Sequence, residues 1–184
     1  MSEDYLVRQA APTLAGMKTG SLFPCAYDSY EALKTEIRSL NRALHGKGLR
    51  LLPLRRSQTR ALLYLYRPAR LGKDLSAPAA SSLLRKAGYN SPGVPACLRE
   101  LIRRFQSGGE FPHEIGLFLS YPPEDVKGFI EHHGYDGKCT GYWKVYGDSD
   151  RAQRTFRAYK ACTDRCCRQC AMGVPVAELA ADAV

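Results

Sequence analysis

Four cysteines in the last quarter of the chain are the side chains whose type and spacing most readily suggest chemistry. They are Cys162, Cys166, Cys167 and Cys170. On a helix, three of them repeat every four residues and would offer thiolates to one metal ion or cluster. The spacing is not the double C-x2-C of a zinc ribbon or a ferredoxin, and all four fall on the apolar arc of the projected helix. We therefore expect core packing, with metal binding and redox chemistry as the alternatives.

A histidine beside a carboxylate is the second feature with chemical potential. His113 and Glu114 precede the apolar run 115–119, which predicts a short strand. Such a pair can act as general acid or base with an orienting partner, or ligate a metal. Adjacent residues of an extended chain point to opposite faces, and no second His follows at zincin spacing. We expect a structural role, and the alternative is an enzyme that uses His113 with Glu114 or Lys144 in support.

Aromatic and cationic residues gather on predicted strands and could recognise a flat or anionic ligand. Alternation over residues 141–146 places Tyr142, Lys144 and Tyr146 on one face. Such a face can stack a flat ring, and an arginine at a strand end can hold an anion. An ordinary core layer beneath helices is the competing interpretation. The candidate ligand-binding residues are Arg67, Tyr121, Tyr142, Lys144 and Tyr146.

The positive charge of the chain is concentrated in its middle. The formal net charge is +9, from 27 Lys and Arg against 18 Asp and Glu. Residues 49–104 contain twelve of the basic residues and only two acidic ones, Asp74 and Glu100. A localised field of this kind suits phosphate, nucleic acid or another acidic partner, although solvated surface arginines would give the same count. The RNP signature of an RNA-recognition motif is absent, so a nucleic-acid-binding module is an alternative without motif support.

Length and composition exclude several classes of protein. The chain has 184 residues, of which 45% are hydrophobic and 24% charged, which indicates one globular domain rather than disorder, collagen or coiled coil. No apolar run approaches the roughly 18 residues of a membrane span, and no signal peptide is visible. We expect a cytoplasmic protein with no membrane partner, and an odd count of seven cysteines argues against a disulfide framework. P-loop, classical dinucleotide-binding and α/β-hydrolase motifs are absent.

Periodicity and turn residues predict an α+β fold. We expect a single domain with a small mixed sheet, made of a hairpin and a β-α-β crossover, packed with about five helices. The domain would cover residues 28–172, after an irregular arm at 1–27 and before a flexible tail at 173–184. An Asp28–Glu31 capping box should start the first helix. The expected strands are 49–54, 60–66, 115–119 and 141–146, and further helices are expected at 76–87, 94–105, 123–133 and 149–170.

Four stretches of the sequence resemble one family. The longest is Phe111-Pro-His-Glu-Ile-Gly-Leu-Phe-Leu-Ser-Tyr-Pro-Pro-Glu-Asp-Val-Lys-Gly-Phe-Ile130. The others are residues 12–18, residues 62–68 and the run Gly141-Tyr-Trp-Lys-Val-Tyr-Gly147. Together they are similar to the bacterial domain of unknown function 3793 family, seen mainly in anaerobic Firmicutes and their relatives. Ser120 stands where this family is expected to have Gly, which weakens the turn predicted there.

The resemblance implies redox or iron metabolism and a redox-protein partner, but it carries no catalytic residue and no cofactor. The first expectation is therefore a small binding or accessory protein for an anionic or flat ligand. Three alternatives stay open: an enzyme based on His113, a nucleic-acid-binding module and a thiol-ligated metal protein.

Overall fold

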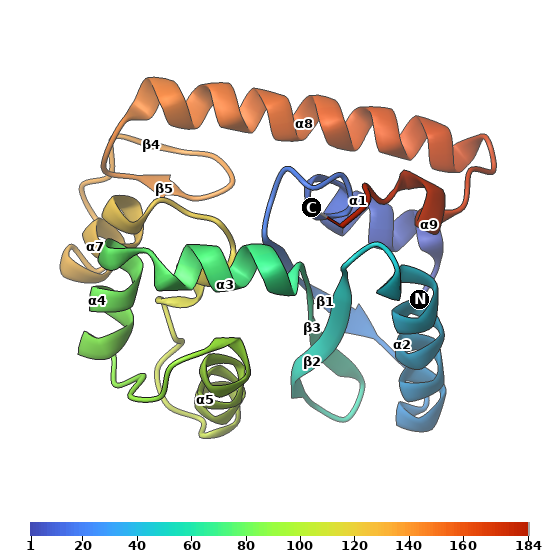
Figure 1. Ribbon diagram of the computed structural model, residues 1–184, viewed down its shortest axis with the longest axis horizontal. Coiled ribbons are helices and arrows are strands. Elements are labelled where there is room, and N and C mark those ends of the chain that lie inside the picture. Colours follow the sequence, from blue (N-terminus) through green and yellow to red (C-terminus); the bar gives the residue numbers. More distant parts are fainter. Residues whose placement is uncertain (184) are drawn as a thin grey trace. The chain divides into compact units, whose positions relative to one another are not determined.

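A computed structural model describes residues 1–183, which divide into two compact units (Figure 1). Unit 1 contains residues 1–70 and the chain from Ala161 onward, and unit 2 contains Leu71–Lys160. Within the described residues the chain has nine helices, one sheet of three strands and one of two. The α+β class is confirmed, although about five helices were expected. Each helix within residues 1–183 is too short or too polar to span a membrane.

The sheet of unit 1 is antiparallel throughout. It consists of β1 (Gly20–Ala26), β2 (Arg50–Arg56) and β3 (Arg60–Tyr66) in the order β1-β3-β2. The predicted hairpin is therefore confirmed as β2–β3, and Pro53 lies on an edge strand, next to a bulge before Arg55. The expected mixed sheet is wrong because the third strand comes from the N-terminal segment and pairs antiparallel with β3.

The first 27 residues, which we expected to be irregular, contain a helix and a strand. Residues Glu3–Leu14 form α1, which starts at Ser2, whose hydroxyl accepts a hydrogen bond from the Tyr5 N–H. Pro12 lies in the last turn, so it ends the helix rather than preventing it. The apolar side of α1 is buried because it packs on the sheet; its buried apolar residues are Leu6, Val7, Ala10, Ala11 and Leu14. The helical period of α1 is short, and Pro12 within it is typical of a segment without a helix.

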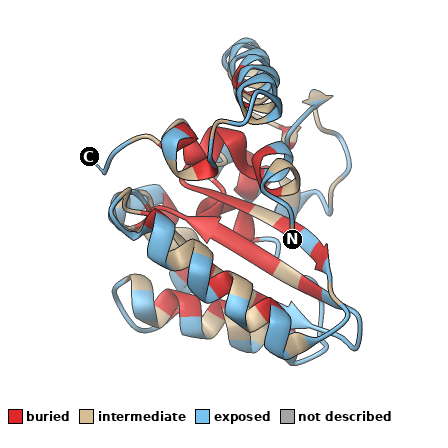
Figure 2. Cartoon of the chain, turned by 90° about the vertical axis from the view of Figure 1, so that its right-hand side faces the viewer, coloured by how far each residue is buried: buried red, intermediate tan, exposed pale blue. Residues whose placement is uncertain are grey.

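Helix α2 (Tyr30–His45) joins α1 on the same face of the sheet. Its N-cap is Ser29 and not Asp28, because the Ser29 hydroxyl accepts from the Ala32 N–H at 3.5 Å. Burial is confined to one side of the helix, at Leu33, Ile37 and Leu44, and the other side is exposed (Figure 2). The C-terminal part of α8 (Ser149–Ala171) and the short α9 (Val176–Leu179) complete the core of unit 1.

Unit 2 is mainly helical. It contains most of α3 (Pro68–Ser76), followed by α4 (Pro78–Lys86), α5 (Val94–Gln106), α6 (Ile115–Phe118), α7 (Pro123–Glu131) and the first part of α8. The remaining elements are the two-residue strands β4 (Cys139–Thr140) and β5 (Lys144–Val145), which pair with each other. The helices expected near 76–87, 94–105, 123–133 and 149–170 are confirmed.

The predicted β-α-β crossover does not exist. The run 115–119 is the helical turn α6, in which Gly116 accepts hydrogen bonds from the N–H groups of Leu119 and Tyr121. A Cβ on Gly116 would lie 2.7 Å from Val126 Cγ2, so a glycine lets α7 pack closely here. A short run buried on every side has no period that separates a strand from a helix. The expected strand 141–146 is likewise reduced to Lys144 and Val145.

Asp125, in the first turn of α7, connects this helix by hydrogen bonds to the segment that contains β4 and β5. Its buried carboxylate accepts hydrogen bonds from Trp143 Nε1 at 2.7 Å, from the Tyr146 N–H at 2.8 Å and from the Gly147 N–H at 2.7 Å. Three donors satisfy the buried charge, which would otherwise be costly to keep away from water.

We expect Asp125→Ala to lower the free energy of unfolding by about 3 kcal/mol, because it leaves the buried Trp143 Nε1–H and two partly buried backbone N–H groups without their acceptor. Trp143 is the only tryptophan, so its fluorescence during urea unfolding reports the change directly. The exposed neighbour Glu124 provides the control, since Glu124→Ala should cost less than about 1 kcal/mol. An equal effect of the two substitutions would contradict the role given to Asp125.

Candidate functional site

His113 and Glu114 have different surroundings and different partners. Glu114 is buried, where its Oε1 accepts from the Tyr89 hydroxyl at 2.9 Å and lies 3.3 Å from Arg104 Nη1. Desolvation, followed by the Glu114 charge, raises the pKa of Tyr89 and keeps this phenol protonated. His113 is exposed and its ring contacts Phe129, with 4.9 Å between ring centres. Glu114 therefore has a structural role, and the enzyme hypothesis loses the pairing on which it was based.

Arg67 is a buried structural cation of unit 1. Its Nε donates to the Thr13 carbonyl at 2.9 Å, and its Nη1 donates to the Lys47 carbonyl at 3.0 Å. Its Nη2 donates to the carbonyls of Leu14, at 2.6 Å, and Ala181, at 2.9 Å. Desolvation, followed by the nearby charge of Arg70, lowers the pKa of this guanidinium. Four carbonyls surround it, so the structure does not support Arg67 as a ligand-binding residue.

Tyr121 and Tyr142 lie together in unit 2, but as parts of an aromatic cluster. The Tyr121 ring stacks on Trp143 with 5.0 Å between centres, and its hydroxyl donates to the Tyr142 carbonyl at 2.9 Å. Burial raises the pKa of Tyr121 to about 12. The Tyr142 ring contacts Phe156 and Tyr159, at 5.8 and 5.3 Å between centres. The Tyr121 ring is thus used in packing, as expected for a core layer, whereas the Tyr142 side chain remains 41% exposed.

Lys144 and Tyr146 hold the loop between α7 and β4. Lys144 Nζ donates to the Gly134 carbonyl at 2.5 Å, and the Tyr146 hydroxyl donates to the Tyr135 carbonyl at 2.8 Å. The Tyr146 ring also stacks on His132 with 5.5 Å between centres. Both side chains are only partly exposed. Of the five predicted ligand-binding residues, Arg67 therefore lies in unit 1 and the other four lie in unit 2.

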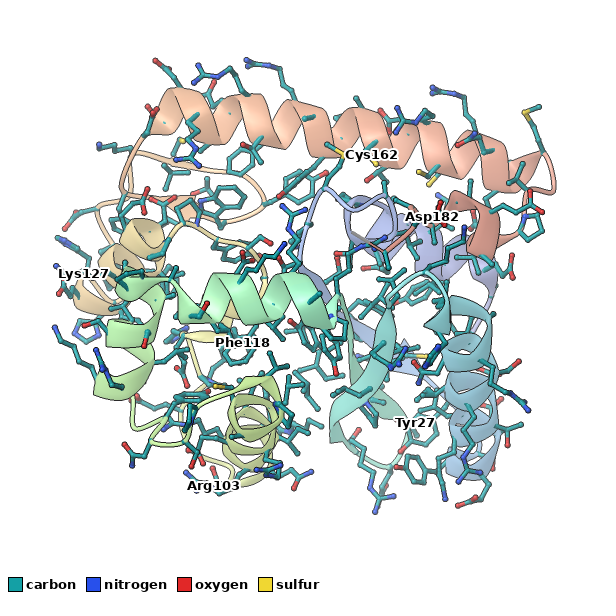
Figure 3. All side chains as sticks on the ribbon, in the orientation of Figure 1. Tyr27, Arg103, Phe118, Lys127, Cys162 and Asp182 are labelled. Carbon is teal, nitrogen blue, oxygen red and sulfur yellow. The ribbon has the colours of Figure 1, made fainter. Side chains whose placement is uncertain are left out.

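The four cysteines of α8 are packed into or against the core of unit 1. Cys162 and Cys166 are almost completely buried, and Cys162 lies on the inward side of the helix (Figure 3). Burial, with a smaller contribution from Cys166, raises the pKa of Cys162 to about 11. Burial also raises the pKa of Cys167 and Cys170. Within the described part of the chain, no three His, Cys, Asp or Glu side chains are placed to hold a metal ion.

A cavity of about 360 Å³ lies in unit 2 beside the loop that joins α4 to α5. Apolar side chains form part of its wall, where Leu75, Leu84 and Cys97 are buried and Val94 is half-buried. Polar groups line the rest: the hydroxyls of three serines, one amide and one guanidinium. These residues are Ser76, Ser81, Ser91, Asn90 and Arg85.

Two features give this cavity a positive character. Arg85 is exposed, and no hydrogen bond or ion pair of its side chain occurs within the described residues. The 13-residue α5 begins at Val94 without a capping side chain, because its N-cap is Gly93 with φ +90°. Pro95 has no N–H, but the other first N–H groups of α5 and the helix dipole favour an anion at this end. A negatively charged group would therefore be favoured beside Arg85 and Val94.

A second cavity, of about 320 Å³, lies on the other side of the same loop. It shares Tyr89, Asn90 and Ser91 with the first cavity. Its charged residues belong to α5 and include Glu100, whose carboxylate is 2.7 Å from Arg103 Nη2. The pKa of Glu100 is lowered to about 2, and the largest cause is its hydrogen bonding with the Arg103 side chain. The Glu100 carboxylate in this lining would repel an anion, and Tyr89 and Ala96 are its only apolar lining residues, so the first cavity is the better candidate site for an anion with an apolar group.

The sequence pattern does not identify this site. Residues 49–104 carry the excess positive charge and include Arg85, but no motif assigns a role to the loop 88–93. The signal was present as Gly88 and as the run Asn90-Ser91-Pro92-Gly93, which is typical of an exposed turn before a helix. What could not be deduced is that α3, α4 and α5 leave a cavity beside that turn.

Comparison with known proteins identifies one family. The family model described as "Protein of unknown function (DUF3793)" matches residues 6–180. The match extends from α1 to the residue after α9, so it includes both units. No curated protein and no solved structure matches the chain.

We expect Arg67→Met to lower the free energy of unfolding by about 3 kcal/mol. The substitution keeps much of the side-chain volume but leaves four carbonyls without their charged donor. Arg70→Met is the matched control, because Arg70 is exposed and donates to one carbonyl only, that of Gly16. Urea unfolding followed by circular dichroism compares the two variants. A cost for Arg67→Met below about 1 kcal/mol would show that the guanidinium is dispensable.

The buried thiol of Cys162 makes unfolding depend on pH. Since its pKa is raised in the folded state, the unfolded thiol loses its proton first as pH rises, and stability falls between about pH 9 and 11. The unfolding free energy of the wild type should therefore decrease by on the order of 1–2 kcal/mol more than that of Cys162→Ala over this interval. Cys139→Ala, outside the unit 1 core, should follow the wild type. Parallel pH profiles for all three proteins would contradict the prediction.

Proposed function

We propose that this chain, which belongs to the DUF3793 family, is a binding protein for a small anion that carries a short apolar group. The cavity beside the α4–α5 loop supports this proposal, because it combines an unpaired guanidinium with an apolar wall. This function keeps the expected ligand class, an anionic small molecule, and assigns it to a different set of residues.

Size and chemistry restrict the ligand. A volume of about 360 Å³ is at the lower end of the range of small-molecule sites. The hydroxyls of Ser81 and Ser91 can donate to an anionic oxygen, whereas the Ser76 hydroxyl already donates to the Lys73 carbonyl at 3.0 Å. Arg85 can bind a carboxylate or phosphate through two N–H groups. Leu75 and Leu84 offer apolar contact to the remainder of the molecule. Carboxylates and phosphate monoesters with one small ring or a short chain fit this description.

The other predicted roles are separate from this proposal. An association with redox or iron metabolism, and a redox-protein partner, depend on the family resemblance alone and stay predictions. A cytoplasmic location also stays a prediction.

Calorimetric titration with three probes tests the ligand class. Phenyl phosphate offers both an anion and a ring, inorganic phosphate offers only the anion, and phenol only the ring. We expect phenyl phosphate to bind at least about tenfold more tightly than either, which corresponds to about 1.4 kcal/mol. Equal affinities for phenyl phosphate and inorganic phosphate, or no saturable binding of any probe, would contradict the proposal.

Two variants locate the binding site. Arg85→Gln should weaken phenyl phosphate about tenfold, whereas Lys86→Gln, an exposed neighbour outside the cavity, should not. Gly72→Leu should block the cavity without backbone strain, because a Cβ at Gly72 has ordinary contact with Val94 Cγ2 at 3.6 Å. Retained circular dichroism shows that each variant is folded. Wild-type affinity in both Arg85→Gln and Gly72→Leu would move the site elsewhere.

A further inference from the structure

A row of cations follows one side of α2 in unit 1. Lys34, Arg38 and Arg42 are four residues apart, so successive charges lie one helical turn, or about 6 Å, from each other. Arg38 and Arg42 are exposed and Lys34 is half-buried. Within the described residues, the side chains of Arg38 and Arg42 have no hydrogen bond or ion pair. The row therefore presents two unpaired guanidinium groups to solvent.

This side of α2 borders the edge strand β2. The Asn41 amide donates to the Leu51 carbonyl and accepts from the Leu51 N–H, both at 2.8 Å. At the other end, the Arg56 guanidinium lies 4.4 Å from the centre of the Tyr30 ring. Tyr30 to Asn41 on a helix and Leu51 to Arg56 on a strand each span about 17 Å, so the two elements run antiparallel. Figure 1 shows α2 beside the sheet, and Figure 2 views its exposed side.

The cations of the two elements therefore form one band. We call Lys34, Arg38, Arg42 and Arg56 the α2–β2 strip. Among the acidic residues of α2, Glu31 is 3.1 Å from Lys34 and compensates that end only. Two further arginines on the hairpin, Arg55 and Arg60, are exposed and add positive charge near the same end. The strip therefore keeps a net positive charge, which is least compensated at Arg38 and Arg42.

The strip has the chemistry of a nucleic-acid surface rather than a protein interface. Protein interfaces depend on exposed apolar or aromatic anchors, and none of the exposed large hydrophobic residues belongs to α2 or the hairpin. The aromatic ring next to the strip is that of Tyr30, and the Arg56 and Lys34 side chains already lie over it. Surfaces that bind nucleic acid are polar and strongly positive, and their affinity comes mainly from phosphate contacts.

We propose that the α2–β2 strip binds the phosphodiester backbone of a nucleic acid without sequence preference. The guanidinium groups of Arg38, Arg42 and Arg56 can each bind phosphate oxygens, and no side chain of the strip is placed to distinguish bases. This surface belongs to unit 1 and is independent of the cavity in unit 2. It also differs from the segment 49–104, since three of its four cations come from α2.

Fluorescence anisotropy with labelled 20-nucleotide single strands and 20-base-pair duplexes of mixed sequence tests this proposal. We expect saturable binding at 50 mM salt that weakens steeply as salt rises. The triple variant Arg38→Gln, Arg42→Gln, Arg56→Gln should bind at least about tenfold more weakly at 100 mM salt, and its logarithmic salt slope should be smaller by about 3. The preference between the two probes shows whether the strip binds single-stranded or double-stranded nucleic acid, and either result supports the proposal.

A charge-matched control separates the strip from net charge. Arg154→Gln, Arg157→Gln, Arg168→Gln removes three exposed arginines of α8 and should leave affinity within about twofold of the wild type. Gly72→Leu should also leave oligonucleotide binding unchanged, which distinguishes this surface from the proposed ligand cavity. Circular dichroism and thermal unfolding check that each variant is folded. Absence of binding at 50 mM salt, equal losses in the two triple variants, or tighter binding of a poly-glutamate peptide than of either oligonucleotide would overturn the proposal.

Discussion

The structure of unit 1 depends on the hydrogen bonds that the Arg67 guanidinium donates to four backbone carbonyls. Arg67 lies directly after β3 and donates to carbonyls at the end of α1, after α2 and after α9. These segments are far apart in sequence. One side chain therefore joins the C-terminal ends of three helices, whose carbonyls would otherwise be unsatisfied. A charged donor is worth about 1.5–3 kcal/mol per hydrogen bond, which makes this position sensitive to any shorter or neutral residue.

Packing and buried polar contacts determine which surfaces remain available in each unit. In unit 1, α1, α2 and the cysteines of α8 share one apolar core, so the cations of α2 are left beside the edge of β2. In unit 2, Asp125 fixes the β4–β5 segment, and Glu114 holds Tyr89 at the end of the α4–α5 loop. The same loop lines the cavity. Buried polar residues thus have structural roles in both units, whereas the unpaired arginines are at the surfaces for which we propose binding.

Local sequence signals predicted most helices and the hairpin, because they depend on period and turn residues. The strand pattern of β2 and β3 and the start of α7 at Pro123 are of this kind. The errors occurred where local signals compete with packing. Pro12 hid α1, and the apolar run 115–119 is buried on every side and therefore lacks a period. The partner of β3 was missed because strand pairing across forty residues leaves no local trace.

The candidate site was harder to predict than the fold. Arg67, Lys144 and Tyr146 are residue types that bind ligands, but their donors are directed to backbone carbonyls, and no sequence pattern distinguishes these two uses. Arg85 belongs to a basic segment that the sequence did indicate. Its place beside a cavity depends on how three helices pack, which composition and spacing do not encode.

The central claim is that an anion binds beside the α4–α5 loop, and amide chemical shifts measured by ¹H–¹⁵N NMR during a phenyl phosphate titration test it most directly. The account predicts saturable shifts at Asn90, Ser91, Gly93 and Val94, which line the cavity, with one common dissociation constant. Shifts concentrated on α2 and β2, or spread evenly over the surface without saturation, would contradict it.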